Sequence, residues 1–370
     1  MAETKSEISR RAFAKVAVGA AGAAALTMTL PLVAEETATS PAIRPVIVDA
    51  AATILSPTAS TDVVTHALEQ MKKGGVSCVL AAVATTEDWP ATMANILAFT
   101  PFLEKYGLVR AKSASEIEAA HANGKIAVVY HCRGSFMLGS PFGIRGALIS
   151  TFDVKRISTL HELGVRVMQV TDDFKGYIGD GCTERTDCEL TDYGIWAIKT
   201  MNDAGILVDC SHAGYRTSIQ TIEISRHPVI FSHSNAKALC PSKRNISDEQ
   251  IRAVAAKGGV IGISTVGHLV HPNKPTLEGF LDHVDYVAKL AGVQHVGLGF
   301  DYSSETAADY DRLHRDPATY PKPPWTYAVE DWSRMTAVVD GLRARKYDEQ
   351  AIRQILGENF LRVYRQVWKS

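Results

Sequence analysis

Short apolar runs rich in β-branched residues alternate with amphipathic segments along most of the chain after residue 45. Eight runs have this character, and they cover Pro45–Asp49, Val76–Val83, Ile126–Cys132, Val165–Thr171, Ile206–Ser211, Val229–Ser232, Val260–Thr265 and His295–Phe300. Near-continuous apolar runs of this length are typical of strands buried on both faces, as in a parallel sheet covered by helices. The pattern therefore predicts eight parallel strands with helices between them.

The segments between these runs carry helix start signals. Thr191 precedes one amphipathic segment, Ser247 with Gln250 forms a capping box before another, and a further helix is expected from Thr276 to Leu290. Eight β/α units without a long linker predict an α/β fold, a (β/α)₈ TIM-type barrel, as a single domain over residues 35–370. A doubly wound sheet is the alternative, and chemistry-bearing residues after at least four strands favour the barrel.

Residues 1–34 differ from the rest of the chain. Arg10 and Arg11 precede an uncharged, Gly- and Ala-rich run from Val16 to Ala34, which is the pattern of a twin-arginine signal peptide. A membrane anchor is the alternative, because the run approaches the ~17–25 residues that span a bilayer. The weak hydrophobicity and the small residues near Ala34 favour cleavage. We therefore expect a periplasmic mature chain that begins near Glu35 and has no stable membrane anchor.

The composition is that of an ordinary globular chain, with 46% hydrophobic and 21% charged residues among 370. A formal net charge of −1 provides no basic face, so no nucleic-acid partner is expected. Cys182 and Cys188 lie in one polar loop and could pair in an oxidising periplasm, with two free thiols as the alternative. The other cysteines are expected to be small core residues, and they are Cys78, Cys132, Cys210 and Cys240.

Candidate chemistry lies where the predicted strands end, because catalytic side chains of such barrels gather at the C-terminal ends of the strands. The fifth strand leads to His212, the sixth to His233 and the eighth to Asp301. The third strand ends with His131 and Arg133, and the fourth ends with Asp172 and Asp173. Two imidazoles and a carboxylate from neighbouring strands are ligand types that zinc prefers. Histidines that only form hydrogen bonds at the barrel rim are the alternative.

From about residue 176 to its C-terminus, the chain resembles the renal, or membrane, dipeptidase family of zinc peptidases in the amidohydrolase superfamily. The matching stretches include "LTDYG", "MNDAGILVDCSHAG", "RHPVIFSHSNAKALCPSKRNISDEQI" and "FLDHVDYVAKLAGVQHVGLGFD". The resemblance implies that His212 and His233 hold one zinc of a two-zinc site and that Arg244 binds the substrate carboxylate. It also implies that Asp301 serves the other zinc and the nucleophilic water. A dipeptide-like small molecule is the implied substrate, and a homodimer is left open.

The N-terminal half departs from the family at the metal site. Ala51 and Thr53 stand where the family's first strand carries a His-x-Asp pair of ligands. Arg133 aligns with the glutamate that bridges the two metals, and Asp172 aligns with a histidine that polarises the scissile carbonyl. A guanidinium stays protonated and repels a dication. We therefore expect at most one zinc ion, bound through the two histidines.

Three interpretations follow from this mixture of retained and lost residues. The first is a hydrolase with at most one zinc that cleaves a small peptide or amide with a free carboxylate. The second is a metal-free enzyme of another reaction type, in which Arg133 stabilises an oxyanion and the histidines or Asp301 transfer protons. The third is a catalytically inactive periplasmic binding or maturation protein that holds a carboxylate through Arg244. For an enzyme, the candidate catalytic residues are Asp301, Asp172 and Arg133.

The segment that follows the last predicted strand, from Ala307 to Trp325, is rich in proline and tyrosine. Its position after a strand end makes it either a lid that shapes the mouth of the barrel or a solvated connection to the C-terminal helices. Both interpretations stay open at the level of sequence.

The export signal generates the first testable prediction. Replacing Arg10 and Arg11 together by lysine should leave the protein in the cytoplasm, because the twin-arginine route reads that pair. Cell fractionation followed by mass determination should place the unaltered protein in the periplasm, cut near Ala34. Export of the doubly substituted chain at the unaltered level would show that residues 1–34 are not a twin-arginine signal.

Overall fold

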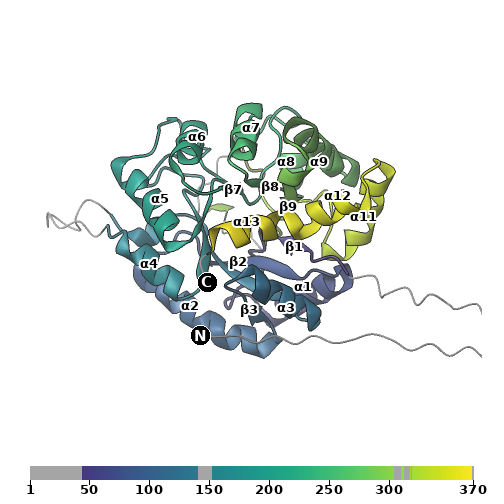
Figure 1. The fold of residues 1–370 in the computed structure, drawn as a ribbon, viewed down its shortest axis with the longest axis horizontal. Coiled ribbons are helices and arrows are strands. Elements are labelled where there is room, and N and C mark those ends of the chain that lie inside the picture. The colour runs from purple at the N-terminus through teal and green to yellow at the C-terminus, as the bar shows by residue number, and fades with distance from the viewer. Residues whose placement is uncertain (1–43, 141–151, 304–309, 312–316, 318, 369–370) are drawn as a thin grey trace, which may run out of the picture. The chain divides into compact units, whose positions relative to one another are not determined.

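The computed structural model describes residues 44–140, 152–303, 310–311, 317 and 319–368. Neighbouring strands are parallel, and the pairing of β2 with both β1 and β4 closes an eight-stranded barrel (Figure 1). The short β3 pairs with β4 outside the closed ring. The strands are β1 (Val48–Asp49), β2 (Cys78–Ala84), β3 (Val109–Arg110), β4 (Ala127–Cys132), β5 (Val165–Gln169), β6 (Leu207–Asp209), β7 (Ile230–Phe231), β8 (Val260–Ile263) and β9 (Val296–Leu298).

The predicted (β/α)₈ barrel is confirmed, and each of the eight apolar runs contributes one barrel strand. The strand β3 was not predicted, because its two residues are too few to form a recognisable apolar run. The helix starts predicted at Thr191, Ser247 and Thr276 are confirmed. Each of these side chains accepts a hydrogen bond from the backbone N–H three residues further on, which satisfies a donor that the helix itself leaves unpaired.

Helices surround the barrel strands (Figure 1). The longer ones are α1 (Thr61–Gly74), α2 (Trp89–Tyr106), α3 (Ala114–Ala122), α4 (Lys155–Glu162), α5 (Asp192–Ala204), α6 (Tyr215–Ile224), α7 (Asp248–Ala256), α9 (Leu277–Ala291), α11 (Met335–Ala344) and α13 (Asn359–Val367). The short ones are η1 (Phe136–Leu138), α8 (Gly267–Val270), η2 (Val293–His295), η3 (Trp332–Arg334), α12 (Glu349–Arg353) and η4 (Gln354–Glu358).

The interior of the barrel is apolar at one end and polar at the other. Residues two apart on a strand share a face, so Val129, His131 and Arg133 follow one another along the inner face of β4. At the apolar end, Phe360 of α13 packs against the inner cluster, and Gly297 makes room for it, because a Cβ there would lie 2.4 Å from the Phe360 ring. The inner cluster includes Val48, Leu80, Val129, Val167, Leu207, Ile230 and Val260.

The predictions about export and about the cysteines have different outcomes. Residues 1–34 lie outside the described residues, and none of the described helices is long and apolar enough to cross a membrane. Cys182 and Cys188 are free thiols, so the structure agrees with the alternative to a disulfide. The prediction that the remaining cysteines are buried core residues is confirmed.

Asp49 ties the first barrel strand to the last. One carboxylate oxygen accepts hydrogen bonds from the backbone N–H groups of Ala51 at 3.1 Å and Phe300 at 2.9 Å, and the other accepts from Trp332 Nε1 at 2.8 Å. The carboxyl group is fully buried, and this burial raises the pKa of Asp49 to about 7 against the opposing effect of its three donors. Asp49 thus fixes the strand ends that bring Ala51 next to Asp301, whose N–H donates to the Ala51 carbonyl at 3.0 Å.

The buried carboxyl generates a prediction about stability and pH. Because the pKa of Asp49 is higher in the folded chain than in the unfolded one, folding favours the protonated form, and this stabilisation is lost as the pH rises through about 7. The unaltered protein and Asp49→Asn should therefore differ in their free energy of unfolding by an amount that depends on pH. The difference should favour the unaltered protein by about 2 to 3 kcal/mol more at pH 5 than at pH 8. Urea unfolding of both proteins at the two pH values measures this difference. A difference independent of pH would contradict the prediction.

Candidate active site

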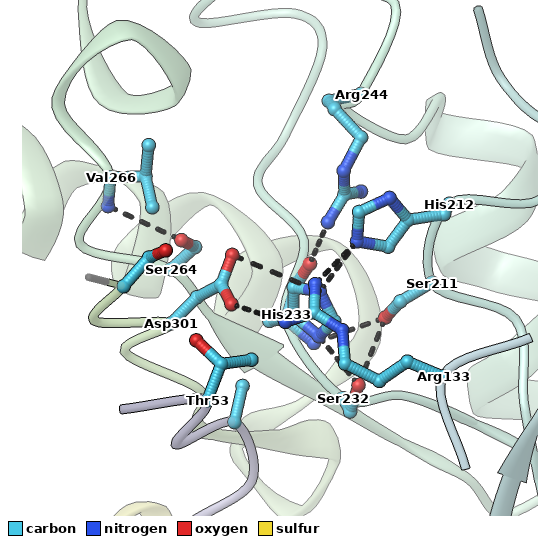
Figure 2. A network of polar contacts seen from close by, with 12 residues as sticks. Thr53, Arg133, Ser211, His212, Ser232, His233, Arg244, Ser264, Val266 and Asp301 are labelled. Carbon is cyan, nitrogen blue, oxygen red and sulfur yellow. Dashed lines mark hydrogen bonds and ion pairs between the residues drawn. The ribbon is translucent and has the colours of Figure 1, made fainter. Parts of the chain in front are cut away.

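Four polar side chains from different strand ends meet at the C-terminal mouth of the barrel (Figure 2). Arg133 follows β4, His212 follows β6, His233 follows β7 and Asp301 follows β9. All four are among the residues singled out from the sequence, and the structure places them in one hydrogen-bonded group. This end of the barrel is where strand-end residues converge in the fold.

The guanidinium of Arg133 lies at the centre of this group. Its Nη1 donates to Asp301 Oδ1 at 3.1 Å, and its Nη2 lies 2.9 Å from His212 Nε2 and 3.0 Å from His233 Nε2. The two imidazole Nε2 atoms are only 2.8 Å apart. Because arginine can only donate, both imidazoles present Nε2 lone pairs to the same nitrogen of a permanent cation.

His212 is held at its other ring nitrogen by Asp173. Its Nδ1 donates to Asp173 Oδ1 at 2.6 Å, and the hydroxyl of Tyr320 donates to the same oxygen at 2.7 Å. Burial lowers the pKa of His212 and the charge of Arg244 lowers it further, whereas Asp173 acts in the opposite direction. The ring is therefore neutral at pH 7, with its proton on Nδ1 and its lone pair on Nε2.

His233 is anchored from inside the barrel. Its Nδ1 donates to Ser232 Oγ at 2.7 Å, and Ser232 Oγ donates to Asp209 Oδ2 at 2.5 Å. Burial opposes ionisation of Asp209, but the ring of His131, 3.2 Å from Oδ2, and the Ser232 hydroxyl lower the pKa of Asp209 to about 2. Burial and the charge of Arg133 lower the pKa of His233 well below its ordinary value, so this ring is also neutral.

Asp173, rather than Asp172, is the main carboxylate partner of His212. Asp172 Oδ1 lies 3.3 Å from His212 Nδ1 and accepts the backbone N–H of Asp173 at 2.8 Å. Gly181 permits this turn, because a Cβ there would lie 2.1 Å from the Asp173 carbonyl oxygen and 2.3 Å from that of Asp172. Both residues were expected at the end of the fourth strand, and the family resemblance singled out Asp172 rather than Asp173.

Two of the site residues have an unusual backbone conformation. The φ angles of His212 and Asp301 are 67° and 61°, in the left-handed region that costs a residue with a Cβ about 1 kcal/mol or more. Backbone hydrogen bonds hold both residues in place, from Cys182 N to the His212 carbonyl at 2.7 Å and from Asp301 N to the Ala51 carbonyl. The surrounding fold therefore imposes the positions of these side chains.

The end of β1 brings no metal-ligating side chain to the mouth. Ala51 offers only a buried methyl group. Thr53 lies below Asp301 in Figure 2, and its hydroxyl donates to the Tyr302 carbonyl at 3.0 Å. The neighbourhood of Asp301 thus contains an alanine and a threonine engaged with the backbone.

Arg244 is buried and lies above the two histidines in Figure 2. Its Nη2 donates to the His233 carbonyl at 2.9 Å, and its Nη1 lies 3.4 Å from Ser234 Oγ. A cavity of about 160 Å³ adjoins this guanidinium. The residues that line it include Arg244, His212, Cys182, Lys237 and Lys243. The lining also includes the acidic Glu184 and Asp187 but not Arg133, His233 or Asp301, and its three basic side chains leave a small excess of positive charge beside Arg244.

The residues present do not fit the two-metal centre that the resemblance implies. The Nε2 atoms of both histidines and Asp301 are bound to Arg133, and a dication ~4 Å from a guanidinium would be repelled by about 8 kcal/mol at an effective dielectric constant of ~20. Asp172, Asp173 and His212 form a group of metal-ligand type, with ligand atoms within 4.8 Å of one another. However, His212 Nδ1 and Asp173 Oδ1 are 2.6 Å apart, a hydrogen-bond distance shorter than the ~3.3 Å between two ligands of a tetrahedral zinc.

Tyr320 is a site residue that sequence reasoning did not single out. It belongs to the proline- and tyrosine-rich segment after the last strand, most of whose first half lies outside the described residues. The ring of Tyr320 is buried, stacks on Trp325 and contacts His268 edge to face. The end of this segment thus reaches the mouth, although the sequence offered only its composition and its position after a strand end as signals.

The sequence model of the membrane dipeptidase family (peptidase family M19) matches residues 47–370. A dipeptidase from Clonostachys rogersoniana, verJ, is 28% identical over 284 residues, which cover 76% of this chain and only 66% of that relative.

Two solved structures share the fold. An amidohydrolase from Pseudomonas aeruginosa is 23% identical, with a TM-score of 0.76, over 88% of this chain and 97% of its own. A metallo peptidase from Rhodobacter sphaeroides, liganded with a phosphinate mimic of the dipeptide L-Ala-D-Ala, is 20% identical with a TM-score of 0.70, over 88% of this chain and 100% of its own. The family match spans well over half of the sequence, and the chain therefore belongs to the membrane dipeptidase family of hydrolases.

Proposed function

We propose that this protein acts on a small peptide or amide that carries a free carboxylate, at a mouth that holds at most one metal ion. The observation that carries the proposal is the cavity of about 160 Å³ that the buried Arg244 lines together with His212. A buried guanidinium beside a neutral imidazole can hold a carboxylate next to a group that accepts a proton. The metallo peptidase from Rhodobacter sphaeroides, which shares the fold, is liganded with a phosphinate mimic of the dipeptide L-Ala-D-Ala, and this supports a small peptide as the class of ligand.

In this proposal, each of the two arginines binds a different anionic part of the ligand. Arg244 binds the carboxylate and fixes the ligand in the mouth, which supplies orientation. Arg133 stabilises the negative charge that develops on the carbonyl oxygen during attack, as a fixed donor in a site with little water. Asp301 accepts a hydrogen bond from Arg133 Nη1 and so keeps the guanidinium next to the two histidines.

His212 is the proton acceptor in this proposal. Its Nδ1 proton is fixed by Asp173, so the lone pair on Nε2 points into the mouth. That lone pair accepts a hydrogen bond from Arg133 Nη2 at 2.9 Å. A ligand oxygen that draws Arg133 towards itself releases Nε2, which can then take a proton from an attacking water molecule.

A second candidate function is a binding or maturation protein without catalysis. The observation that favours it is the engagement of both imidazole Nε2 atoms with Arg133, since neither lone pair is available until the guanidinium moves. Both functions require the carboxylate site at Arg244, and they differ only in turnover. Release of amino acids from a dipeptide panel by the purified mature protein separates them.

The carboxylate site generates a prediction about affinity. Calorimetric titration with dipeptides should show that Arg244→Met weakens binding by at least ~30-fold, because a buried charge-assisted pair is lost. Replacing the dipeptide carboxylate by a carboxamide should weaken binding to the unaltered protein by a similar factor, and should have little further effect on Arg244→Met.

The control for this titration is Arg226→Met, which removes an exposed arginine that pairs with the exposed Asp203 and is not among the residues of the cavity or the mouth. It should bind dipeptides like the unaltered protein. Thermal unfolding of each variant confirms that the fold is kept. Equal affinity for dipeptides and their carboxamides in the unaltered protein would overturn the proposed carboxylate site.

A further inference from the structure

The side-chain atoms at the mouth that are of the metal-ligand type surround one position, and the guanidinium of Arg133 occupies it. His212 Nε2 and His233 Nε2 are 2.8 Å apart, and His233 Nε2 lies 3.9 Å from Asp301 Oδ2. Imidazole nitrogens and carboxylate oxygens gathered in this way are a typical donor set for a transition-metal ion. Arg133 Nη2 lies about equally far from the two nitrogens, and Nη1 donates to the carboxylate (Figure 2).

We propose that the guanidinium of Arg133 is the resident cation of this site, so that the protein needs no metal ion at its mouth. The proposed function allows at most one metal ion, whereas this inference states that none is needed. It does not depend on the identity of the ligand. The two histidines and Asp301 then serve as hydrogen-bond acceptors for an arginine. They are side chains of the metal-ligand type, but they bind a cation that belongs to the chain.

Charge balance supports this assignment. Both Nε2 atoms accept from Arg133, while His212 Nδ1 lies against Asp173 Oδ1 and His233 Nδ1 against Ser232 Oγ, so the group consists of one positive guanidinium, one negative carboxylate and two rings with a single proton each. It is neutral as a whole. A zinc ion added beside Arg133 would bring two further positive charges into a place where the Arg133 and Asp301 side chains are only 11% and 12% exposed. Such an excess of buried charge is strongly unfavourable.

The attachment of Arg133 to the barrel gives it a second advantage over a free ion. The backbone N–H of Arg133 donates to the Ala84 carbonyl at 2.7 Å, which extends the pairing of β4 with β2 up to the mouth. The guanidinium is therefore delivered by a strand of the closed barrel at a high effective concentration. A metal ion from solution would have to displace this tethered donor from three acceptors at once.

The replacement changes the chemistry that the mouth can perform. A guanidinium has no open coordination position, so it does not convert a bound water molecule into hydroxide as zinc does. It still offers positive charge and N–H donors to an oxyanion or a carboxylate. The mouth is consequently suited to binding and stabilising anions, with proton transfer left to the neutral imidazoles.

The experiment compares zinc binding by the full mature chain with and without the charge at position 133. Arg133→Met and Arg133→Gln both remove the charge, and the second keeps hydrogen-bonding capacity in case the first fails to fold. Zinc affinity is measured by competition with a chromophoric chelator, and zinc content by elemental analysis after dialysis. Arg133→Lys, which keeps a positive charge, is the matched control.

The unaltered protein and Arg133→Lys should retain no zinc, whereas the two neutral variants should bind one zinc ion at least ~100-fold more tightly. Adding His212→Ala to Arg133→Met should abolish that gain, which locates the ion at the mouth. Two-bond ¹H–¹⁵N spectra of the histidine rings should stay unchanged when zinc is added to the unaltered protein. A zinc ion retained by the unaltered protein and lost on His212→Ala would overturn the inference, as would neutral variants that bind zinc no better than the unaltered protein.

A triple substitution tests whether the residues at three positions are what prevents this mouth from holding two zinc ions. Ala51→His, Thr53→Asp and Arg133→Glu together supply ligand side chains at the three positions that lack them, so zinc content should rise towards two per chain. Content that stays at zero in this variant would contradict the geometry on which the inference depends. The dipeptide titrations test the proposed function separately, since they are performed without added metal on proteins that keep Arg133.

Discussion

The positive charge of Arg133 is the element on which the arrangement of the mouth depends. Four strand ends contribute to its surroundings, and three of them do so by pointing an acceptor at its guanidinium. Without a cation there, two imidazole lone pairs at 2.8 Å would face each other beside a carboxylate. Apolar residues such as Val129 fill one end of the barrel interior, so that the polar side chains around Arg133 lie at the other end.

The two histidines look equivalent at their Nε2 atoms but differ in what holds them. His212 is coupled through Asp173 to Tyr320, and therefore to the segment that follows the last strand. His233 is coupled through Ser232 to Asp209, which lies within the barrel. Movement of the loop region can thus reach one imidazole while the other stays tied to the core. An asymmetric pair of this kind suits a site in which only one ring has to exchange a proton.

The fold could be predicted from the sequence because each barrel strand is an uninterrupted apolar run, and β3 was missed because its two residues form no run. The strand-end residues of the site could be predicted for the same reason, since topology brings all strand ends to one mouth. Asp173 also stood at a predicted strand end, but nothing in the sequence distinguished it from Asp172 as the partner of His212, and nothing singled out Tyr320. Both roles depend on side-chain directions, in a turn and in a long connection. For Arg133 the sequence indicated repulsion of a metal, but not that the retained histidines and Asp301 would bind the guanidinium itself.

The left-handed backbone at His212 and Asp301 has a cost that the contacts of their side chains must offset. Glycine would relieve about 1 kcal/mol of backbone strain at each position, but it would also remove an acceptor from the buried guanidinium of Arg133. Marginal stability makes such strain a sizeable part of what holds a domain folded. The two residues thus identify the mouth as a part of the molecule where backbone stability is given up in exchange for the placement of side chains.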